Sequence, residues 1–180
     1  MRLLLKILVL FAYFVLFSCF SGEKKVIKNK VNFVKNIPIK DVQQFGDWYF
    51  SNSGLECFIF SFPISSSGDY LLRSYNYMMI NYNKSKNTKE IYIIGGLPYK
   101  EGSLVRVYIN KVDFFFIPYN NQAWGENEEA ILKKMFSSKE NFLVFNDFKD
   151  NVSAIDKYSM LGFKQAFENL NNACVSVESI

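Results

Sequence analysis

Three cysteines constrain this chain more than any other feature of its sequence. Cys57 and Cys174 lie near the two ends of the segment 45–174, whereas Cys19 follows an apolar N-terminal run. An odd cysteine count in an exported protein indicates that one thiol has a separate fate. If Cys19 is modified at a signal-peptide cleavage site, Cys57 and Cys174 remain to form a disulfide bond. The alternative is that these two residues stay reduced as buried thiols.

The first residues carry the pattern of an export signal. Arg2 and Lys6 supply positive charge, and residues 7–17 are uniformly apolar. This run is shorter than the roughly 20 residues that a membrane-spanning helix requires. It therefore predicts the hydrophobic region of a cleaved signal peptide rather than a permanent span.

The signal ends in a sequence that resembles a bacterial lipobox. Residues 16–19 read Leu-Phe-Ser-Cys, although Phe17 stands where a smaller or β-branched residue is usual. The pattern predicts a lipoprotein-type signal peptide over residues 1–18 and lipidation of Cys19, which would anchor the protein to a membrane at the periplasm or cell surface. Two alternatives remain. One is ordinary cleavage after Ser21, giving a soluble periplasmic or secreted protein, and the other is an uncleaved anchor.

Charge is distributed unevenly along the chain. Residues 19–44 hold six lysines against two acids, whereas residues 45–180 hold 13 basic and 15 acidic residues. The folded part is therefore not basic, and it lacks the patterns of nucleic-acid binders. We interpret residues 19–44 as a lysine-rich linker or tether above anionic head groups, where each cation adds about 1 kcal/mol. A solvated, disordered linker is the alternative.

The segment 45–174 has the pattern of one β-rich domain. Apolar and aromatic runs recur between turn residues, at 45–50, 55–62, 75–82, 90–94, 104–109, 113–118, 142–145 and 152–155. Ser51-Asn52-Ser53-Gly54 predicts a hairpin turn, since Gly54 tolerates positive φ. Alternation places Val105, Val107 and Ile109 on one face of a strand, and Arg106 and Tyr108 on the other.

Two helices complete the expected fold. Residues 126–136 begin with acids and end with lysines, as the helix dipole favours. Residues 160–171 carry one apolar stripe, with Ser159 as the expected N-cap. We therefore expect a mainly β fold, an antiparallel sandwich or partly open barrel with two short helices, one of them C-terminal. Residues 175–180 are expected to form a tail.

The sequence offers little for catalysis. Without histidine, Ser-His, Cys-His and His-metal arrangements are absent. Asp147, Asp150 and Asp156 are interpreted as a solvated turn, with a cation or acid–base cluster as the alternative. We expect a non-enzymatic protein with no cofactor and no metal.

Two aromatic residues are candidates for an interaction surface. Trp124 lies at a strand-to-helix junction and is interpreted as a core or recognition residue, because tryptophan is common at binding hot spots. Phe115 is the centre of Phe114-Phe115-Phe116, which cannot alternate between apolar and polar faces. At least one of these rings should face away from the core, against a helix or a partner. Trp48 is expected to be a core residue.

Several short motifs occur together in one order. They are Cys57-Phe58-Ile59-Phe60-Ser61-Phe62-Pro63, then Gly68-Asp69-Tyr70 and Arg73, Gly96-Leu97-Pro98-Tyr99-Lys100, Val105 to Ile109, Ala123-Trp124, Met135, and Asp156-Lys157-Tyr158-Ser159-Met160-Leu161-Gly162-Phe163 with Ala166 and Cys174. Through them residues 45–174 resemble the invasion-associated locus B family of exported alphaproteobacterial proteins. The chain departs from the family in lacking a cysteine just after Trp48 and in replacing an Asp-Gly turn with Asn110-Lys111.

The resemblance implies an envelope protein linked to host-cell association or invasion, a virulence role, with no established catalytic residues. It also favours pairing of Cys57 with Cys174, since both lie at the edges of the matching region. The expected partners are a membrane, through Cys19, and a host or envelope protein. Two other hypotheses remain: a periplasmic carrier or chaperone-like barrel that encloses an apolar ligand, and an enzyme with an unrecognised carboxylate site.

Overall fold

The computed structural model describes residues 42–54, 56–68, 73 and 75–174. The predicted signal peptide over 1–18, Cys19, nearly all of the 19–44 linker and the 175–180 tail lie outside the described residues. Within the part that is described, no helix combines the length and the apolar character needed to cross a membrane.

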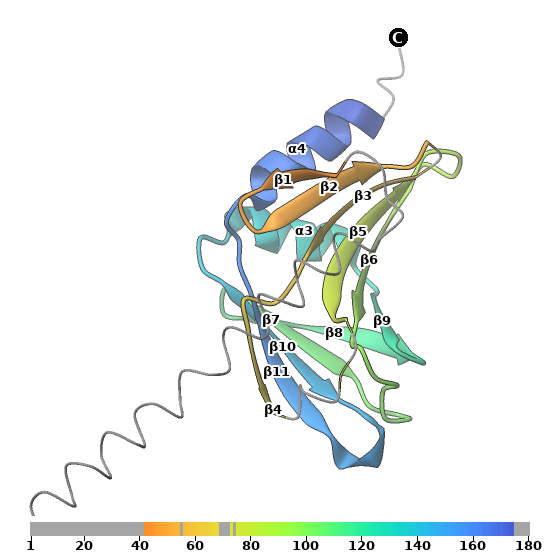
Figure 1. Cartoon of the computed structure of the whole chain (residues 1–180), viewed down its shortest axis with the longest axis vertical. Coiled ribbons are helices and arrows are strands. Elements are labelled where there is room, and N and C mark those ends of the chain that lie inside the picture. The colour runs from red at the N-terminus through yellow and green to blue at the C-terminus, as the bar shows by residue number, and fades with distance from the viewer. Residues whose placement is uncertain (1–41, 55, 69–72, 74, 175–180) are drawn as a thin grey trace, which may run out of the picture. The chain divides into compact units, whose positions relative to one another are not determined.

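One antiparallel sheet forms the frame of the described domain (Figure 1). Its strands are β1 (Gln43–Phe45), β2 (Trp48–Asn52), β3 (Glu56–Ser61), β4 (Ser65–Gly68), β5 (Tyr77–Asn83), β6 (Thr88–Ile94), β7 (Val105–Ile109), β8 (Val112–Tyr119), β9 (Gln122–Gly125), β10 (Phe142–Asp147) and β11 (Ser153–Tyr158). Their order across the sheet is β1-β2-β3-β5-β6-β9-β8-β7-β10-β11-β4, so the sheet is open at β1 and β4. The helices are α3 (Glu128–Ser137) and α4 (Phe163–Cys174). The expected fold class, mainly β with two helices and one of them C-terminal, is confirmed.

Alternating side chains give the sheet an inner and an outer face. In β7, Val105, Val107 and Ile109 are fully buried on the inner face, as the sequence predicts. A two-residue loop joins β7 to β8, and both Asn110 and Lys111 have positive φ. Such a loop matches the twist of paired strands, so it fixes the register of this hairpin without an Asp-Gly pair.

The two helices cover part of the inner face. Figure 1 shows α4 lying along β1, β2 and β3, and this helix contacts all three strands. Its buried stripe consists of Phe163, Ala166, Phe167, Leu170 and Cys174. Trp48 packs edge-on against Phe163 at 5.1 Å between ring centroids, and its indole N–H donates to the Ser159 carbonyl oxygen at 2.8 Å. The prediction that Trp48 belongs to the core is confirmed.

Two local predictions need correction. The run 45–50 is not one strand, because the chain turns at Gly46 and Asp47 between β1 and β2. Gly46 has φ +56°, and an added Cβ would lie 2.7 Å from the Leu161 carbonyl oxygen, so this tight approach requires glycine. Ser159 does not cap α4; its hydroxyl accepts from the Leu161 N–H in the turn that precedes the helix.

The sequence also left two strands unpredicted. β4 consists of three serines and a glycine, and β9 of four residues around Ala123. Neither shows an apolar run, so only pairing with β11 and with β6 and β8 holds them in the sheet. Both strands contribute to the outer surface described below.

Candidate interaction surface

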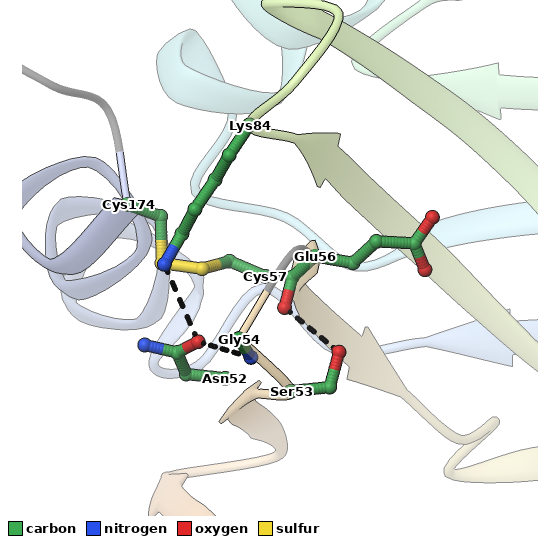
Figure 2. The surroundings of a disulfide bond; sticks show 7 residues. All are labelled: Asn52, Ser53, Gly54, Glu56, Cys57, Lys84 and Cys174. Atoms are coloured by element: carbon green, nitrogen blue, oxygen red, sulfur yellow. Dashed lines mark hydrogen bonds between the residues drawn. A yellow bond between two sulfur atoms is a disulfide. The ribbon is translucent and has the colours of Figure 1, made fainter.

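The predicted disulfide bond is present in the structure. Cys57 on the inner face of β3 is bonded to Cys174, the last residue of α4, with 6.2 Å between their Cα atoms (Figure 2). This Cα separation lies within the usual range for disulfides. Closing a loop of 117 residues restricts the unfolded chain, a stabilisation of about 4–5 kcal/mol in the chain-entropy model. The bond holds the second helix against the sheet.

The hairpin beside the disulfide is fixed by a side chain. The side-chain oxygen Oδ1 of Asn52 accepts from the Gly54 N–H at 2.9 Å and from the Lys84 ammonium at 3.4 Å (Figure 2). Gly54 has φ +93°, as the predicted turn requires. The end of the sheet next to the disulfide is therefore closed by local hydrogen bonds as well as by the covalent link.

An apolar row crosses the outer face of the sheet. Cross-strand pairing aligns one residue from each of six neighbouring strands, namely Tyr49, Phe60, Met79, Tyr92, Trp124 and Ile117. An antiparallel sheet with one solvated face usually carries polar residues there. This sheet is therefore apolar on both faces along the whole row.

Exposure increases along this row. Phe60 is fully buried and stacks on Tyr49 at 5.2 Å between ring centroids. Trp124 is partly buried, with its ring 4.7 Å from that of Tyr92. The Tyr92 hydroxyl donates to the Met79 sulfur at 2.6 Å, and burial raises the pKa of Tyr92 well above its usual value, with smaller contributions from Tyr77, Glu56 and Glu90. Trp124 thus lies on the outer face, not in the inner core.

The exposed end of the outer face lies over β7, β8, β10 and β11. Phe115, Leu104 and Ile117 are 53%, 51% and 47% exposed, and Ile155 is 41% exposed. Phe115 is the ring of the predicted triplet that turns outward, while Phe116 is fully buried on the inner face. We call the set Leu104, Arg106, Phe115, Ile117, Phe145 and Ile155 the outer patch. Contiguous exposed apolar residues of this kind mark interaction sites.

Arg106 is the charged residue of the outer patch. It faces Phe115 on β8 and Phe145 on β10, and its guanidinium carbon lies 3.8 Å from the Phe145 ring centroid. Its Nη1 also approaches Asp113 at 3.5 Å, a long contact between half-exposed groups that contributes little. The stacking holds the guanidinium against an aromatic surface while the side chain stays 41% exposed.

A second group of polar residues is buried on the inner face, and the sequence gave no sign of it. The Asp156 carboxylate accepts from Arg73 Nη2 at 2.7 Å, from Asn146 Nδ2 at 2.9 Å and from the Ser66 hydroxyl at 2.6 Å. The guanidinium carbon of Arg73 lies 5.2 Å from the Phe148 ring centroid. The interpretation of Asp156 as part of a solvated turn is therefore wrong, because this residue points inward from β11 and is 1% exposed.

Tyr99 and Tyr158 lie near this buried ion pair. The Tyr99 hydroxyl donates to Asn146 Oδ1 at 3.1 Å. Burial raises the pKa values of Tyr99 and Tyr158 above the usual tyrosine value; the Asp156 carboxylate raises them further, and Arg73 partly opposes the shift. The Arg73–Asp156 pair joins a residue that precedes β5 to the inner face of β11, so its role is structural cohesion.

The arrangement of acidic residues and cysteines offers no metal centre among the described residues. Within them, no three or more aspartate, glutamate or cysteine side chains gather closely enough to hold an ion. Comparison with protein-family models, with curated proteins and with solved structures finds no match to the chain. The geometry described above is therefore the basis for assigning a function.

Proposed function

We propose that this protein is a non-catalytic, exported envelope protein of the invasion-associated locus B type. Its proposed role is to support host-cell association or invasion by binding a protein partner. In this proposal Cys19 carries a lipid anchor, residues 19–44 form the tether, and the outer patch of the β domain contacts the partner. The ordered motifs of residues 45–174 support the family assignment. The disulfide supports export, since such bonds persist in oxidising compartments.

The observation that carries the binding role is the outer patch itself. Four of its apolar side chains are 41–53% exposed, although Val105, Phe116 and Val144 nearby are fully buried on the inner face. Folding is already served by those inner residues and by the two helices. Apolar side chains that add little to folding, grouped around one arginine, have the composition of a binding hot spot. The filled inner face also favours surface binding over the carrier hypothesis.

Photo-crosslinking in cells tests the binding role. With p-benzoylphenylalanine in place of Phe115, we expect a discrete protein adduct after irradiation of intact cells. The matched control places the same group at Glu168, an exposed residue of α4. Adducts of equal yield at both positions, or none at Phe115, would contradict a partner-binding outer patch.

Two measurements test the envelope assignment. Mass spectrometry of the mature N-terminus should find a lipid-modified Cys19, and an unmodified chain that begins at Gly22 would rule the anchor out. Protease added to intact cells should cleave the protein if its partner belongs to the host. Complete protection would instead assign the partner to the envelope interior.

A further inference from the structure

A pocket opens within the outer patch. It has a volume of about 450 Å³ and lies between the edge strand β4 and the strands β7, β10 and β11. Its apolar walls are Leu104, Phe145 and Ile155, and Ser67 and Ser153 supply hydroxyl groups at the β4 side. The volume falls in the range of sites that enclose a small ligand or anchor a side chain, about 300–1,000 Å³.

The charge of the pocket is concentrated at one wall. Arg106 lines it with its guanidinium stacked on Phe145, and among the described residues its one ion-pair contact is the 3.5 Å approach to Asp113. Stacking fixes the plane of the guanidinium before a partner arrives, so little entropy is lost when a carboxylate binds in two-pronged geometry. Asp147 also lines the pocket and repels anions from its own side. An incoming carboxylate is thereby directed to Arg106.

The surroundings of Arg106 define the chemistry of the complement. Phe115 and Phe145 lie directly across from it on the two neighbouring strands, and Leu104 lies two residues before it, just ahead of β7. The matching ligand therefore carries an anionic group with apolar groups beside it. A free carboxylate alone leaves the apolar walls uncovered, and an apolar group alone leaves the guanidinium covered without a partner, which costs binding energy.

We propose that this pocket recognises an acidic residue flanked by apolar side chains in a segment of a partner protein. The acidic side chain pairs with Arg106, and an apolar neighbour fills the space between Phe145 and Ile155. This inference rests on the proposed function, in that it takes the outer patch as the partner surface, and it adds the chemistry of what binds there.

Peptide titration of the full chain, followed by amide NMR shifts, tests the inference. The probe is acetyl-Phe-Glu-Phe-amide, with acetyl-Phe-Gln-Phe-amide as its uncharged match. We expect the acidic peptide to shift the resonances of Ser67, Phe145 and Ile155, and to bind about tenfold or more tightly than the glutamine peptide, since a charged hydrogen bond is lost in the latter. Equal affinities, no binding of the acidic peptide, or shifts confined to other strands would overturn the proposal.

Two variants separate the role of Arg106 from general charge. Arg106→Gln should lower the affinity for the acidic peptide by about tenfold or more, the same loss that is expected when glutamine replaces the acid of the peptide. Lys157→Gln removes one charge from the same face outside the pocket, and should change the affinity by no more than about twofold. Similar losses in both variants would contradict a specific site. Thermal unfolding of each variant checks that the fold is retained.

Two further experiments test whether the carboxylate comes from a protein segment or a small molecule, and separate this inference from the proposed function. The small acid 3-phenylpropionate should bind more weakly than the peptide; if it binds as tightly, the pocket takes a small molecule and not a protein segment. The Phe115 photo-adduct should be lost in Arg106→Gln. An adduct that persists unchanged sinks the acidic-segment inference but leaves the partner surface intact, whereas no adduct in the wild type sinks the proposed function.

Discussion

The inner and outer faces of the β7–β8 hairpin are built from neighbouring residues but differ in burial. Val105, Val107 and Phe116 are fully buried, whereas Phe115 and Ile117, on the other side of β8, are about half exposed. Both faces are apolar, so hydrophobicity alone does not explain the difference. Two helices and the Arg73 side chain cover parts of the inner face, and the outer patch carries no such cover among the described residues. This contrast supports the proposal that the inner face serves folding and the outer patch serves binding.

The two arginine–aspartate pairs show the same contrast. Arg73 and Asp156 are each 1% exposed at the side chain and lie 2.7 Å apart, with Asn146 completing the carboxylate's hydrogen bonds. Arg106 and Asp113 are about 40% exposed and 3.5 Å apart. A buried ion pair becomes costly when one partner is removed, whereas an exposed pair contributes little. The Arg73–Asp156 pair therefore stabilises the fold, whereas the Arg106–Asp113 pair leaves Arg106 available to a ligand.

The largest effect is expected from the covalent link that closes the inner face. The double variant Cys57→Ala/Cys174→Ala should lose about 4–5 kcal/mol of unfolding free energy, because the unfolded chain regains the freedom of a long loop. Denaturant unfolding of the oxidised wild type and the variant measures this loss. A difference below about 1 kcal/mol would show that the inner face is closed by packing alone.

Adjacent phenylalanines provide the most direct test of the two faces. Phe116→Ala should destabilise the protein by about 3–5 kcal/mol, because it opens a cavity in the inner core. Phe115→Ala, one residue earlier in the same strand, should cost about 0.5 kcal/mol or less, because the ring is half exposed. The comparison is measured by urea unfolding of both variants. Equal losses would mean that the outer patch is part of the folding core.

Substitution of Asp156 should cost more stability than substitution of Asp113, because only the first belongs to a buried ion pair. Asp156→Asn leaves the Arg73 charge buried without a counter-charge, and should cost about 3 kcal/mol. Asp113→Asn breaks the exposed pair and should cost no more than about 0.5 kcal/mol. Thermal unfolding at neutral pH measures both. A small effect at Asp156 would imply that solvent reaches the pair.

Alkaline titration should give the smallest effect, and it concerns the buried tyrosines. Because burial raises the pKa values of Tyr99 and Tyr158 in the folded state, the unfolded chain loses its phenol protons first, near pH 10. Stability should therefore be constant below about pH 10 and fall as the pH rises toward the folded-state values. Tyr158→Phe should reduce this loss, since it removes one of the titrating phenols; among the described residues the Tyr158 hydroxyl has no hydrogen-bond partner that the substitution would break. Tyrosinate absorbance against pH, with unfolding measured in parallel, checks the sign.

Local patterns in the sequence predicted much of the fold. Alternation over residues 104–109, the helical stripe that ends at Leu170 and the turn at Gly54 each follow from short-range rules, and the structure has all three. The pairing of Cys57 with Cys174 followed from the cysteine count together with the family resemblance. Each of these features can be predicted without knowing which distant residues pack against it.

Features that depend on distant partners were missed. Asp156 is buried only because Arg73, more than 80 residues earlier, reaches it. β4 is a strand only because β11 offers a free edge, and Gly46 forms a turn because Leu161 packs against it. One ring of the triplet 114–116 was expected to face away from the core, and Phe115 does so; Trp124, interpreted as a core or recognition residue, lies partly buried on the outer face. Arg106, which lies across from Phe115, and the pocket were not predicted, since no spacing in the sequence indicates that β7, β10, β11 and β4 lie side by side there.

The central claim is that the outer patch binds a partner and is dispensable for folding. Photo-crosslinking from position Leu104, with and without Ile117→Asp, tests both halves in one protein. We predict that Ile117→Asp changes the unfolding free energy by about 0.5 kcal/mol or less and abolishes the adduct formed from Leu104. A variant that loses stability by several kcal/mol, or one that keeps the adduct at full yield, would contradict the account.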